Sequence, residues 1–462
     1  MPAEVLETTC CIVGGGPAGM MLGYLLARQG IPVKVLEKHP DFNRDFRGDT
    51  VHPSTLEVLH ELGLLEKFLD LPHQRVTSAG AIIGDTAFDF ADFKHVPARC
   101  KFVALMPQWD FLNFLSDHAR ALPSFELLME HEARDLLTEG DRISGVSAQN
   151  GSLNVRILAD LVVGCDGRHS VTRGAAGLEL IDHGVPIDVL WFRISRKPDD
   201  PEQVLGNVNY GKALILIDRA DYFQAGLIIE KGSYERIKAR GLDALRSDIR
   251  QIAPYLGERL NELQDWEQIK ILTVQINRLK KWFRPGLLFI GDAAHAMSPV
   301  GGVGINLAIQ DAVAAANLLA EPLRTGSALE ARLAAVQRRR EFPARATQAL
   351  QLFAHRRLAG VFTNPGPIQV PWQMKAFAHI PGIHRALGYA IGIGVRPEHI
   401  NEKGVGRRSS TIRAGIRAGV RTGLLAGIGI AATATGICWA LCEQVLRKRV
   451  RFRVTSALAG PV

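Results

Sequence analysis

The chain has 462 residues, 47% of them hydrophobic, which is long enough for two or three domains with their own cores. Eleven of the 55 basic residues but only one of the 47 acids lie in residues 403–462, so the rest, with 44 bases and 46 acids, is almost neutral and argues against a nucleic-acid partner. The N-terminus lacks the pattern of a secretion signal, and the six cysteines form no CxxC. We therefore expect a cytoplasmic location, reduced thiols and no metal site.

The first predicted strand, TTCCIV at residues 8–13, leads into the glycine-rich turn GGGPAGM. Gly14, Gly16 and Gly19 form G-x-G-x-x-G, a helical pattern follows, and IPVKVLEK predicts a second strand that ends at Glu37. In such a βαβ unit the glycines let a pyrophosphate approach a helix N-terminus, and the acid binds a ribose. A purely structural turn is the alternative. Glu37 indicates FAD or NAD rather than NADP.

The middle of the chain predicts an alternation of strands and helices. HPSTLEVLHELGLLEKF, at residues 52–68, predicts a helix with Ser54 as N-cap and Glu57 closing a capping box. Short strands are expected at about 76–98, and helix and strand alternate from about 102 to 172, where ADLVVGCDG indicates a buried strand before a turn. Residues 182–272 hold several strand-like runs and one helical stretch. The expected fold class is therefore α/β.

A second buried strand runs into GDAAHAMSPVGGVGIN at residues 291–306. Since an extended dinucleotide has two ends, Asp292 would bind the ribityl chain of a flavin. The helix predicted from near Gly304 to about Ala320 would point its N-terminus at the ring. A reduced flavin is negatively charged, and a helix N-terminus stabilises negative charge. This second site predicts FAD rather than NAD as the bound cofactor. Residues 328–392 have a mostly helical pattern.

Three segments, GGGPAGM, VVGCDGRHSVTR and GDAAHAMSPVGGVGINLAIQDA, resemble the three FAD motifs of the group A flavoprotein monooxygenases, the para-hydroxybenzoate hydroxylase and ubiquinone-biosynthesis hydroxylase superfamily. The resemblance covers about residues 5–400. It implies a Rossmann-like FAD-binding domain of the glutathione-reductase type, made of residues 1–75, 100–181 and 273–340. An inserted mixed β-sheet substrate domain would comprise residues 76–99 and 182–272, and a C-terminal helical region residues 341–402.

The same resemblance assigns cofactor-binding residues. It implies that the AMP half of FAD lies against the first turn, that Asp166 takes part in both FAD and NAD(P)H binding, and that the pyrimidine ring lies against the start of the helix near Gly304. The residues expected to bind FAD are Gly14, Gly16, Ala18, Gly19, Glu37, Arg47, Gln108, Asp166, Asp292, Gly302, Gly304, Ile305 and Asn306. Many relatives have P-x-x-G-Q-G where this chain has PVGGVG, so Val303 replaces a glutamine and only backbone contacts survive there.

The implied reaction is a monooxygenation. NADH or NADPH would reduce FAD, and O2 would form a C4a-hydroperoxyflavin that hydroxylates or epoxidises a small hydrophobic, aromatic or isoprenoid substrate. Pro299 would face the flavin edge, and no side chain is expected to act as a covalent nucleophile. His295 is interpreted as a support of the GDAA turn. Candidates for the substrate wall are Trp191, Arg193, Tyr222 and Gln224, although alternate strand residues are equally typical of a core.

Other functions remain alternatives at this point. An FAD-dependent reductase or dehydrogenase of a polyprenyl or related lipophilic substrate would share the fold, and so would a non-catalytic flavin-binding protein. A flavin-dependent halogenase would need W-x-W-x-I-P, which the sequence lacks. The choice between NADH and NADPH, the substrate and the oligomeric state stay open.

The last sixty residues predict contact with a membrane. Residues 423–442, GLLAGIGIAATATGICWALC, are uncharged, and as a helix they would be about 30 Å long, the thickness of a bilayer core. Basic segments flank the run on both sides and would attract anionic headgroups. The helix would either span the bilayer or lie in its surface. A helix packed on the body, or a disordered extension, is the alternative.

Overall fold

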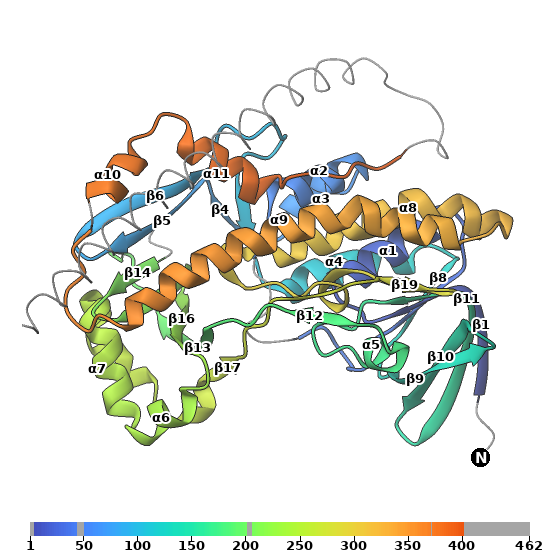
Figure 1. The fold of residues 1–462 in the computed structure, drawn as a ribbon, viewed down its shortest axis with the longest axis horizontal. Helices are drawn as coiled ribbons and strands as arrows, with labels where there is room; N and C mark the ends of the chain where they lie inside the picture. Colours follow the sequence, from blue (N-terminus) through green and yellow to red (C-terminus); the bar gives the residue numbers. More distant parts are fainter. Residues whose placement is uncertain (1–3, 44–49, 201–205, 371, 402–462) are drawn as a thin grey trace, which may run out of the picture. The chain divides into compact units, whose positions relative to one another are not determined.

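The computed structural model describes residues 4–43, 50–200, 206–370 and 372–401 (Figure 1). Residues up to 370 together with 381–401 form one compact unit. Helix α10 (Trp372–Ala378) belongs to a second unit and is not placed relative to the first. Arg47 and the apolar run at 423–442, both singled out above, lie outside the described residues.

The first sheet has a parallel centre. Its parallel order is β20-β11-β1-β2-β8, formed by β20 (Leu287–Phe289), β11 (Leu153–Gly164), β1 (Glu4–Val13), β2 (Val33–Leu36) and β8 (Phe125–Leu128). Three antiparallel strands complete it: β19 (Phe283–Arg284) beside β20, β10 (Arg142–Asn150) beside β11, and β9 (Glu132–Glu139) beside β10. Both faces of the parallel strands are covered, which is why β1 ends in the continuous apolar run CCIV.

Helices pack on one face of this sheet. They share one core and are α1 (Pro17–Ala27), α2 (Pro53–Glu61), α3 (Leu65–Leu69), α4 (Gln108–Arg120) and α8 (Gly304–Thr325). The other face carries a second core around Trp282, with β9 and β10. Helix α5 (Val171–Ala176) follows β11, and α9 (Glu330–Phe362) runs alongside α8 (Figure 1).

The second sheet is mixed and has the order β17-β13-β16-β15-β14-β5-β6. Its strands are β5 (Ser78–Ile83), β6 (Thr86–Asp92), β13 (Ile187–Ser195), β14 (Gly206–Asn209), β15 (Lys212–Asp218), β16 (Tyr222–Glu230) and β17 (Lys270–Leu272). One face packs on α7 (Leu242–Ile252), and the other meets apolar residues at the end of α9. The sheets confirm the predicted class, an α/β domain with a Rossmann-like unit and a second, mixed sheet.

Short elements connect these layers. A three-stranded sheet has the order β3-β7-β4, from β3 (Thr50–Val51), β7 (Val103–Leu105) and β4 (Gln74–Val76), and β12 (Leu180–Asp182) pairs with β18 (Asn277–Leu279). Helices α6 (Tyr234–Ala239) and α11 (Ile383–Gly392) complete the first unit, with 3-10 turns at Pro254–Glu262, Trp266–Gln268, Gly291–Ala293 and Val300–Gly302.

The predicted capping box at the start of α2 is wrong. The helix begins at Pro53 with His52 in the N-cap position, and no side chain caps it. Proline fixes φ and has no N–H, so it favours the first position of a helix and moves Ser54 past the capping position. Glu57 instead accepts a hydrogen bond from the backbone N–H of Arg99, at 3.1 Å.

In the part of the chain that the structure describes, one helix, Val300–Thr325, is long and apolar enough to cross a membrane. It contains α8, and 78% of its apolar window is buried inside the protein, where it forms part of the first core.

Candidate active site

The first glycine turn joins β1 to α1 at the carboxyl edge of the parallel strands. Gly14 has a φ of +108°, and a Cβ atom there would lie 2.4 Å from the carbonyl oxygen of Cys165. A Cβ at Gly19 would lie 2.0 Å from the oxygen of Gly14, so both glycines are needed for close packing. A Cβ at Gly16 would meet nothing within 4 Å, and no side chain caps α1. Open space thus lies before uncapped helix amides, which suits a phosphate.

Glu37 lies beside this turn. It follows the last residue of β2, and its two carboxylate oxygens accept hydrogen bonds from the backbone N–H groups of Gly15 and His39, both at 3.1 Å. The carboxylate is therefore held at the edge of the glycine turn. A Cβ on Gly291 would lie 3.1 Å from the Cβ of Ala18, so the second turn touches the start of α1.

The carboxylate of Asp166 turns into its own loop. It accepts hydrogen bonds from the hydroxyls of Ser170 and Thr172 and, at 3.0 Å, from the backbone N–H of Thr172. Ser170 in turn caps α5 by accepting from the N–H of Arg173. In this structure the Asp166 side chain fixes the loop after β11, next to Gly14.

Two arginines, neither singled out in the sequence, reach the second turn: Arg168 from that loop and Arg173 from α5. Arg168 Nη2 donates to Asp292 Oδ2 at 3.2 Å, and Arg173 Nη1 donates to the carbonyl of Ala293 at 3.0 Å. Burial lowers the pKa of Arg173, while Asp166 and Asp292 act in the opposite direction. The two arginines in DGRHSVTR could have indicated these contacts, but the prediction from this segment concerned only Asp166.

The loop before α8 combines two glycines with positive φ. Gly301 and Gly302 have φ of +81° and +62°, and a Cβ on Gly302 would lie 2.4 Å from Thr50 Oγ1. That hydroxyl donates to the Gly302 carbonyl at 2.8 Å. Pro299 lies half-buried just before this turn. Helix α8 begins at Gly304 without a side-chain cap, and a Cβ on Gly304 would again meet open space.

Asn306, in the first turn of α8, has a fixed orientation. Its Oδ1 accepts from the Thr55 hydroxyl at 2.6 Å and from the His52 N–H at 3.3 Å. Its Nδ2 is buried and has no hydrogen-bond partner among the described residues. Because a buried donor without a partner is costly, a ligand acceptor at this point would satisfy it.

A buried charge network lies beneath the second turn. On α8, Asp311 Oδ2 lies 2.6 Å from His295 Nε2 and accepts from the Gly291 N–H, and Oδ1 accepts from Arg340 Nε at 2.9 Å. Arg340 also donates to Glu398 at 3.1 Å. Burial alone would raise the pKa of Asp311, but His295 and Arg340 lower it below its ordinary value. The structure thus places His295 under the turn, bound to α8.

Helix α9 holds the loop that contains Pro299. Gln351 donates to the carbonyls of Ser298 and Val300, both at 2.9 Å, and accepts from the Ser298 N–H. His355 Nε2 lies 2.7 Å from Ser298 Oγ, and burial lowers the pKa of His355 to about 4. These contacts were not predicted, although polar residues at helical spacing on one side of α9 could have indicated them.

The four candidate substrate residues lie on one face of the second sheet. The register pairs Trp191 with Gly226, Arg193 with Gln224 and Ser195 with Tyr222, and alternate residues of a strand share a face. Trp191 is buried in an apolar cluster, where a Cβ on Gly226 would lie 2.9 Å from its ring. The guanidinium of Arg193 lies over the ring of Tyr222, at 4.9 Å from the centroid. Gln224 accepts from Arg219 at 3.4 Å.

One end of this face meets the strand that leads into Gln108. Ile217, which pairs with Gln224, packs against an apolar cluster that includes Val103 and Leu105 of β7. Gln108 is the first residue of α4, three positions beyond β7. In the β3–β7 pair, Leu105 lies opposite Thr50, the residue that binds Gly302. Strand β7, which precedes Gln108, therefore shares an apolar cluster with Ile217 and pairs with the strand that binds the Gly302 loop.

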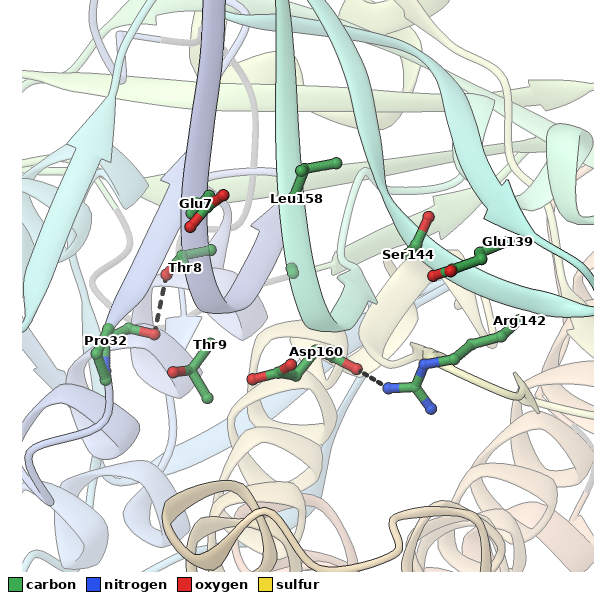
Figure 2. Close-up of a pocket in the computed structure, with 10 residues that line it drawn as sticks. Glu7, Thr8, Thr9, Pro32, Glu139, Arg142, Ser144, Leu158 and Asp160 are labelled. Atoms are coloured by element: carbon green, nitrogen blue, oxygen red, sulfur yellow. Dashed lines mark hydrogen bonds between the residues drawn. The ribbon is translucent and has the colours of Figure 1, made fainter.

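Figure 2 shows a separate hollow of about 610 Å³, lined by Pro32 and by residues from β1, β9, β10 and β11. It lies along the strands rather than at their carboxyl edge. The Thr8 hydroxyl donates to the carbonyl of Pro32 at 3.0 Å, and Arg142 donates to the carbonyl of Asp160. The acids that line it are Glu7, Glu139 and Asp160, and none of the predicted site residues lies there. It is not part of the candidate active site.

The residues present fit FAD. Two helix N-termini, of α1 and α8, lack side-chain caps and face open space at Gly16 and Gly304. Glu37 lies beside the first turn, Asp292 is part of the second turn, and Asn306 in the first turn of α8 has a buried donor. An elongated molecule with a diphosphate at one end and hydrogen-bond acceptors on a ring at the other matches this arrangement.

Comparisons with known proteins give the same result. The FAD binding domain family matches residues 7–351. A 6-methylpretetramide 4-monooxygenase of Streptomyces rimosus is 33% identical over 346 residues, which are 73% of this chain and 81% of that protein. A rifampicin monooxygenase of Streptomyces venezuelae is 28% identical over 313 residues, 65% of this chain and 61% of that protein, so the chain spans about three fifths of that relative.

A solved structure shares the fold. PqsL of Pseudomonas aeruginosa, described as a probable FAD-dependent monooxygenase, has been solved in complex with 2-aminobenzoylacetate. It superposes with a TM-score of 0.65 at 24% identity, over 78% of this chain and 100% of that chain. From the family match and the relative at 33% identity, the chain belongs to the group A FAD-dependent monooxygenases, and FAD is its cofactor.

Proposed function

We propose that this flavoprotein hydroxylates a small aromatic substrate, using O2 and either NADH or NADPH. When bound, FAD supplies the electron transfer from NAD(P)H and the activation of O2. The observation that carries the substrate assignment is the sheet face with Arg193, Tyr222 and Gln224, one end of which meets the region of the Gly302 loop. The relatives named for 6-methylpretetramide and rifampicin, and the complex with 2-aminobenzoylacetate, support a small organic substrate with an aromatic part.

Each of the two turns would bind one half of FAD. Gly14, Gly16, Ala18 and Gly19 would hold the diphosphate, and Glu37 the ribose of the AMP half. Asp292, already bound to Arg168, would take the ribityl chain together with Gln108. Gly302, Gly304, Ile305 and Asn306 would line the pyrimidine ring. A role for Arg47 at the phosphates stays a prediction, because that residue lies outside the described part of the chain.

The chain's own residues would stabilise the reduced cofactor and keep water away. The uncapped N-terminus of α8 and the Nδ2 of Asn306 present partial positive charge and a donor to negative charge on the pyrimidine side. Gln351 and His355 hold the Pro299 loop in position. The apolar cluster around Trp191 excludes water from the sheet face.

An aromatic ring would be recognised at the open end of the face. The Arg193 guanidinium lies over the Tyr222 ring, 4.9 Å from its centroid, and a substrate ring would stack against this pair. Gln224 is buried, lies opposite Arg193 in the sheet and accepts a hydrogen bond from Arg219. A matched pair of variants separates this role from core packing. Tyr222→Leu should raise KM for the substrate, whereas Tyr234→Leu, beside the outer face of the same sheet, should not.

The test of the overall function is an oxygen-uptake screen of the purified yellow protein with NADH and NADPH against phenols, quinol precursors and isoprenoids. Substrate-stimulated uptake and a product that contains one oxygen atom from isotope-labelled O2 are expected. A product with a saturated double bond, formed without O2, would instead identify an FAD-dependent reductase. Absence of any substrate-stimulated turnover would leave a flavin-binding protein without catalysis.

We further propose that residues 403–462 bring the catalytic part to a membrane surface. The support is compositional: eleven bases and one acid surround a twenty-residue uncharged run. Deletion of residues 403–462 should move the protein from the membrane fraction to the soluble fraction without loss of flavin. An unchanged distribution would contradict the proposal.

A further inference from the structure

The outward side of α9 carries apolar side chains where a surface helix usually carries polar ones. Phe342, Leu350 and Phe353 are 55%, 44% and 39% exposed. At about 100° per residue they fall on one side of the helix, and two small residues lie between them. We call this surface the α9 outer stripe: Phe342, Ala346, Ala349, Leu350 and Phe353. Large contiguous apolar patches on soluble proteins mark interaction surfaces.

The buried side of α9 carries polar residues, because this side forms hydrogen bonds and ion pairs with the active-site region. From Arg340 to His355 that side is buried and mainly polar, because Arg340, Gln348, Gln351 and His355 hold the charge network and the Pro299 loop. The inner contacts therefore explain the buried polar residues. They do not explain why the exposed positions are Phe and Leu, since neither the fold nor the flavin site needs an apolar residue there.

The α9 outer stripe is flanked by positive charge. Arg338, Arg345, Arg356 and Arg357 are exposed, and no acid occurs from Phe342 to Phe362. The nearest acid, Glu341, lies 4.0 Å from Arg345. The guanidinium of Arg357 lies over the Phe353 ring, 5.3 Å from its centroid, so positive charge stands directly beside the apolar surface. A partner of this face must be apolar and negatively charged.

We propose that the α9 outer stripe docks on the surface of an anionic lipid bilayer. A helix with aromatic and aliphatic side chains on one face and flanking arginines can lie in the interface plane. The apolar groups then enter the acyl boundary, while the guanidinium groups bind lipid phosphates. This surface belongs to the compact catalytic unit and is distinct from residues 403–462.

Charge distinguishes the bilayer from two other occupants. Residues 403–462 carry eleven bases and one acid, so their packing on this face would bring like charges together. A second copy of the chain in a two-fold contact would set the same arginines against each other. An anionic bilayer offers both the apolar interior and the negative headgroups. An acidic protein surface is the remaining rival, and the test separates it.

The first test is hydroxyl-radical footprinting of the full-length flavoprotein, which reports Phe342, Leu350 and Phe353 directly. Labelling should fall several-fold on anionic phosphatidylglycerol vesicles and less on neutral phosphatidylcholine vesicles, while exposed Phe90 and Leu153 stay labelled. Failure to bind anionic vesicles, or unchanged labelling of the bound protein, would overturn the proposal. Weak labelling of the free protein would also overturn it, because its own tail or a second copy would then cover the stripe. Equal protection by polyglutamate would overturn it in favour of an acidic protein partner.

The second test compares two triple variants of the full chain. Phe342→Ser, Leu350→Ser and Phe353→Ser remove the stripe, and Val5→Ser, Leu153→Ser and Ile271→Ser remove exposed apolar groups of comparable exposure elsewhere. The stripe variant should bind anionic vesicles at least ten-fold more weakly, and the control should stay within two-fold of the unmodified chain. Flavin content and melting temperature should match in all three. Equal vesicle affinity of the two variants would refute the docking surface.

Discussion

His295 Nε2 lies 2.6 Å from Oδ2 of Asp311, and both side chains are buried beneath the turn at residues 291–295. The other oxygen of Asp311 accepts from Arg340 on α9, so one carboxylate joins the turn to two helices. A buried charge is tolerated only when it is paired and hydrogen-bonded. The position of Asp292, the second residue of the turn, therefore depends on α8 and α9 as much as on the turn itself.

Asp311→Ala should lower the free energy of unfolding by about 3–5 kcal/mol, because Arg340 and His295 would remain buried without their common partner. Urea denaturation of the holoprotein measures the change, and flavin release should begin at a lower urea concentration. Asp243→Ala is the matched control, since Asp243 is exposed and pairs with Arg246 at the surface. Its effect should stay below about 1 kcal/mol. Similar losses in both variants would contradict the role of the network.

Stability should fall as the pH drops from about 6.5 toward 4. Burial lowers the pKa of His52 and of His355 from 6.5 to about 4, so in this window the unfolded chain binds protons that the native protein does not. Each histidine lowers the free energy of unfolding by at most about 1.4 kcal/mol per pH unit in this window. Above the pKa of histidine in the unfolded chain it has no effect. Urea midpoints at about pH 7 and about pH 5 measure the loss. His355→Gln should show a smaller loss than the unmodified chain, and an identical loss would rule the explanation out.

Gly302→Ala should weaken FAD binding more than it weakens the fold. Alanine there suffers the strain of a φ of +62° and also presses its Cβ to within 3.1 Å of the whole Thr50 side chain. Gly326→Ala is matched for strain, with a φ of +65°, but its Cβ would meet nothing within 4 Å. Both variants should lose about 1–2 kcal/mol of stability. Only Gly302→Ala should raise the Kd for FAD in a titration of the apoprotein, and equal Kd values would count against a role of this loop in binding.

Asn306→Ala should weaken FAD binding by roughly ten- to a hundred-fold, which corresponds to about 1–3 kcal/mol for the lost donor and its supporting contacts. The change removes Nδ2 and frees the groups that Oδ1 holds, the Thr55 hydroxyl and the His52 N–H. Asn317→Ala serves as control, because Asn317 is on the same helix but binds His399 and Asn401. Flavin fluorescence during reconstitution gives both Kd values. Equal affinities would show that Asn306 does not touch the cofactor.

The features that the sequence predicts well are those fixed by local constraints. The G-x-G-x-x-G turn requires glycines because a Cβ atom at Gly14 or Gly19 would lie within 2.4 Å of backbone atoms. Such a requirement can be recognised from the sequence alone. Strands β1, β11 and β20 end in apolar residues directly before turns, because both faces of the parallel strands are covered there. Even here the local pattern failed once, at α2, where a proline one residue before Ser54 displaced the expected cap.

Contacts between distant segments could not be predicted in this way. Asp311 contacts His295 and Arg340, and Arg340 in turn donates to Glu398; nothing in the sequence spacing of these residues specifies the network. The substrate face is a similar case. Alternation along β13 and β16 suggested which residues share a side, but only the register shows that Arg193 and Gln224 lie opposite each other and that Ile217 leads from them to β7.

The two uncapped helix starts that suit FAD belong to Gly16 and Gly304, almost three hundred residues apart in the chain. At roughly 5–20 residues per second, a ribosome needs about 15 to 60 seconds to deliver the second after the first. A nascent chain therefore contains the first glycine turn long before it contains the residues that would bind the isoalloxazine end of FAD. Binding of the whole of FAD must therefore wait until α8 (Gly304–Thr325) has been made, and a polypeptide that ends before α8 should be purified without flavin.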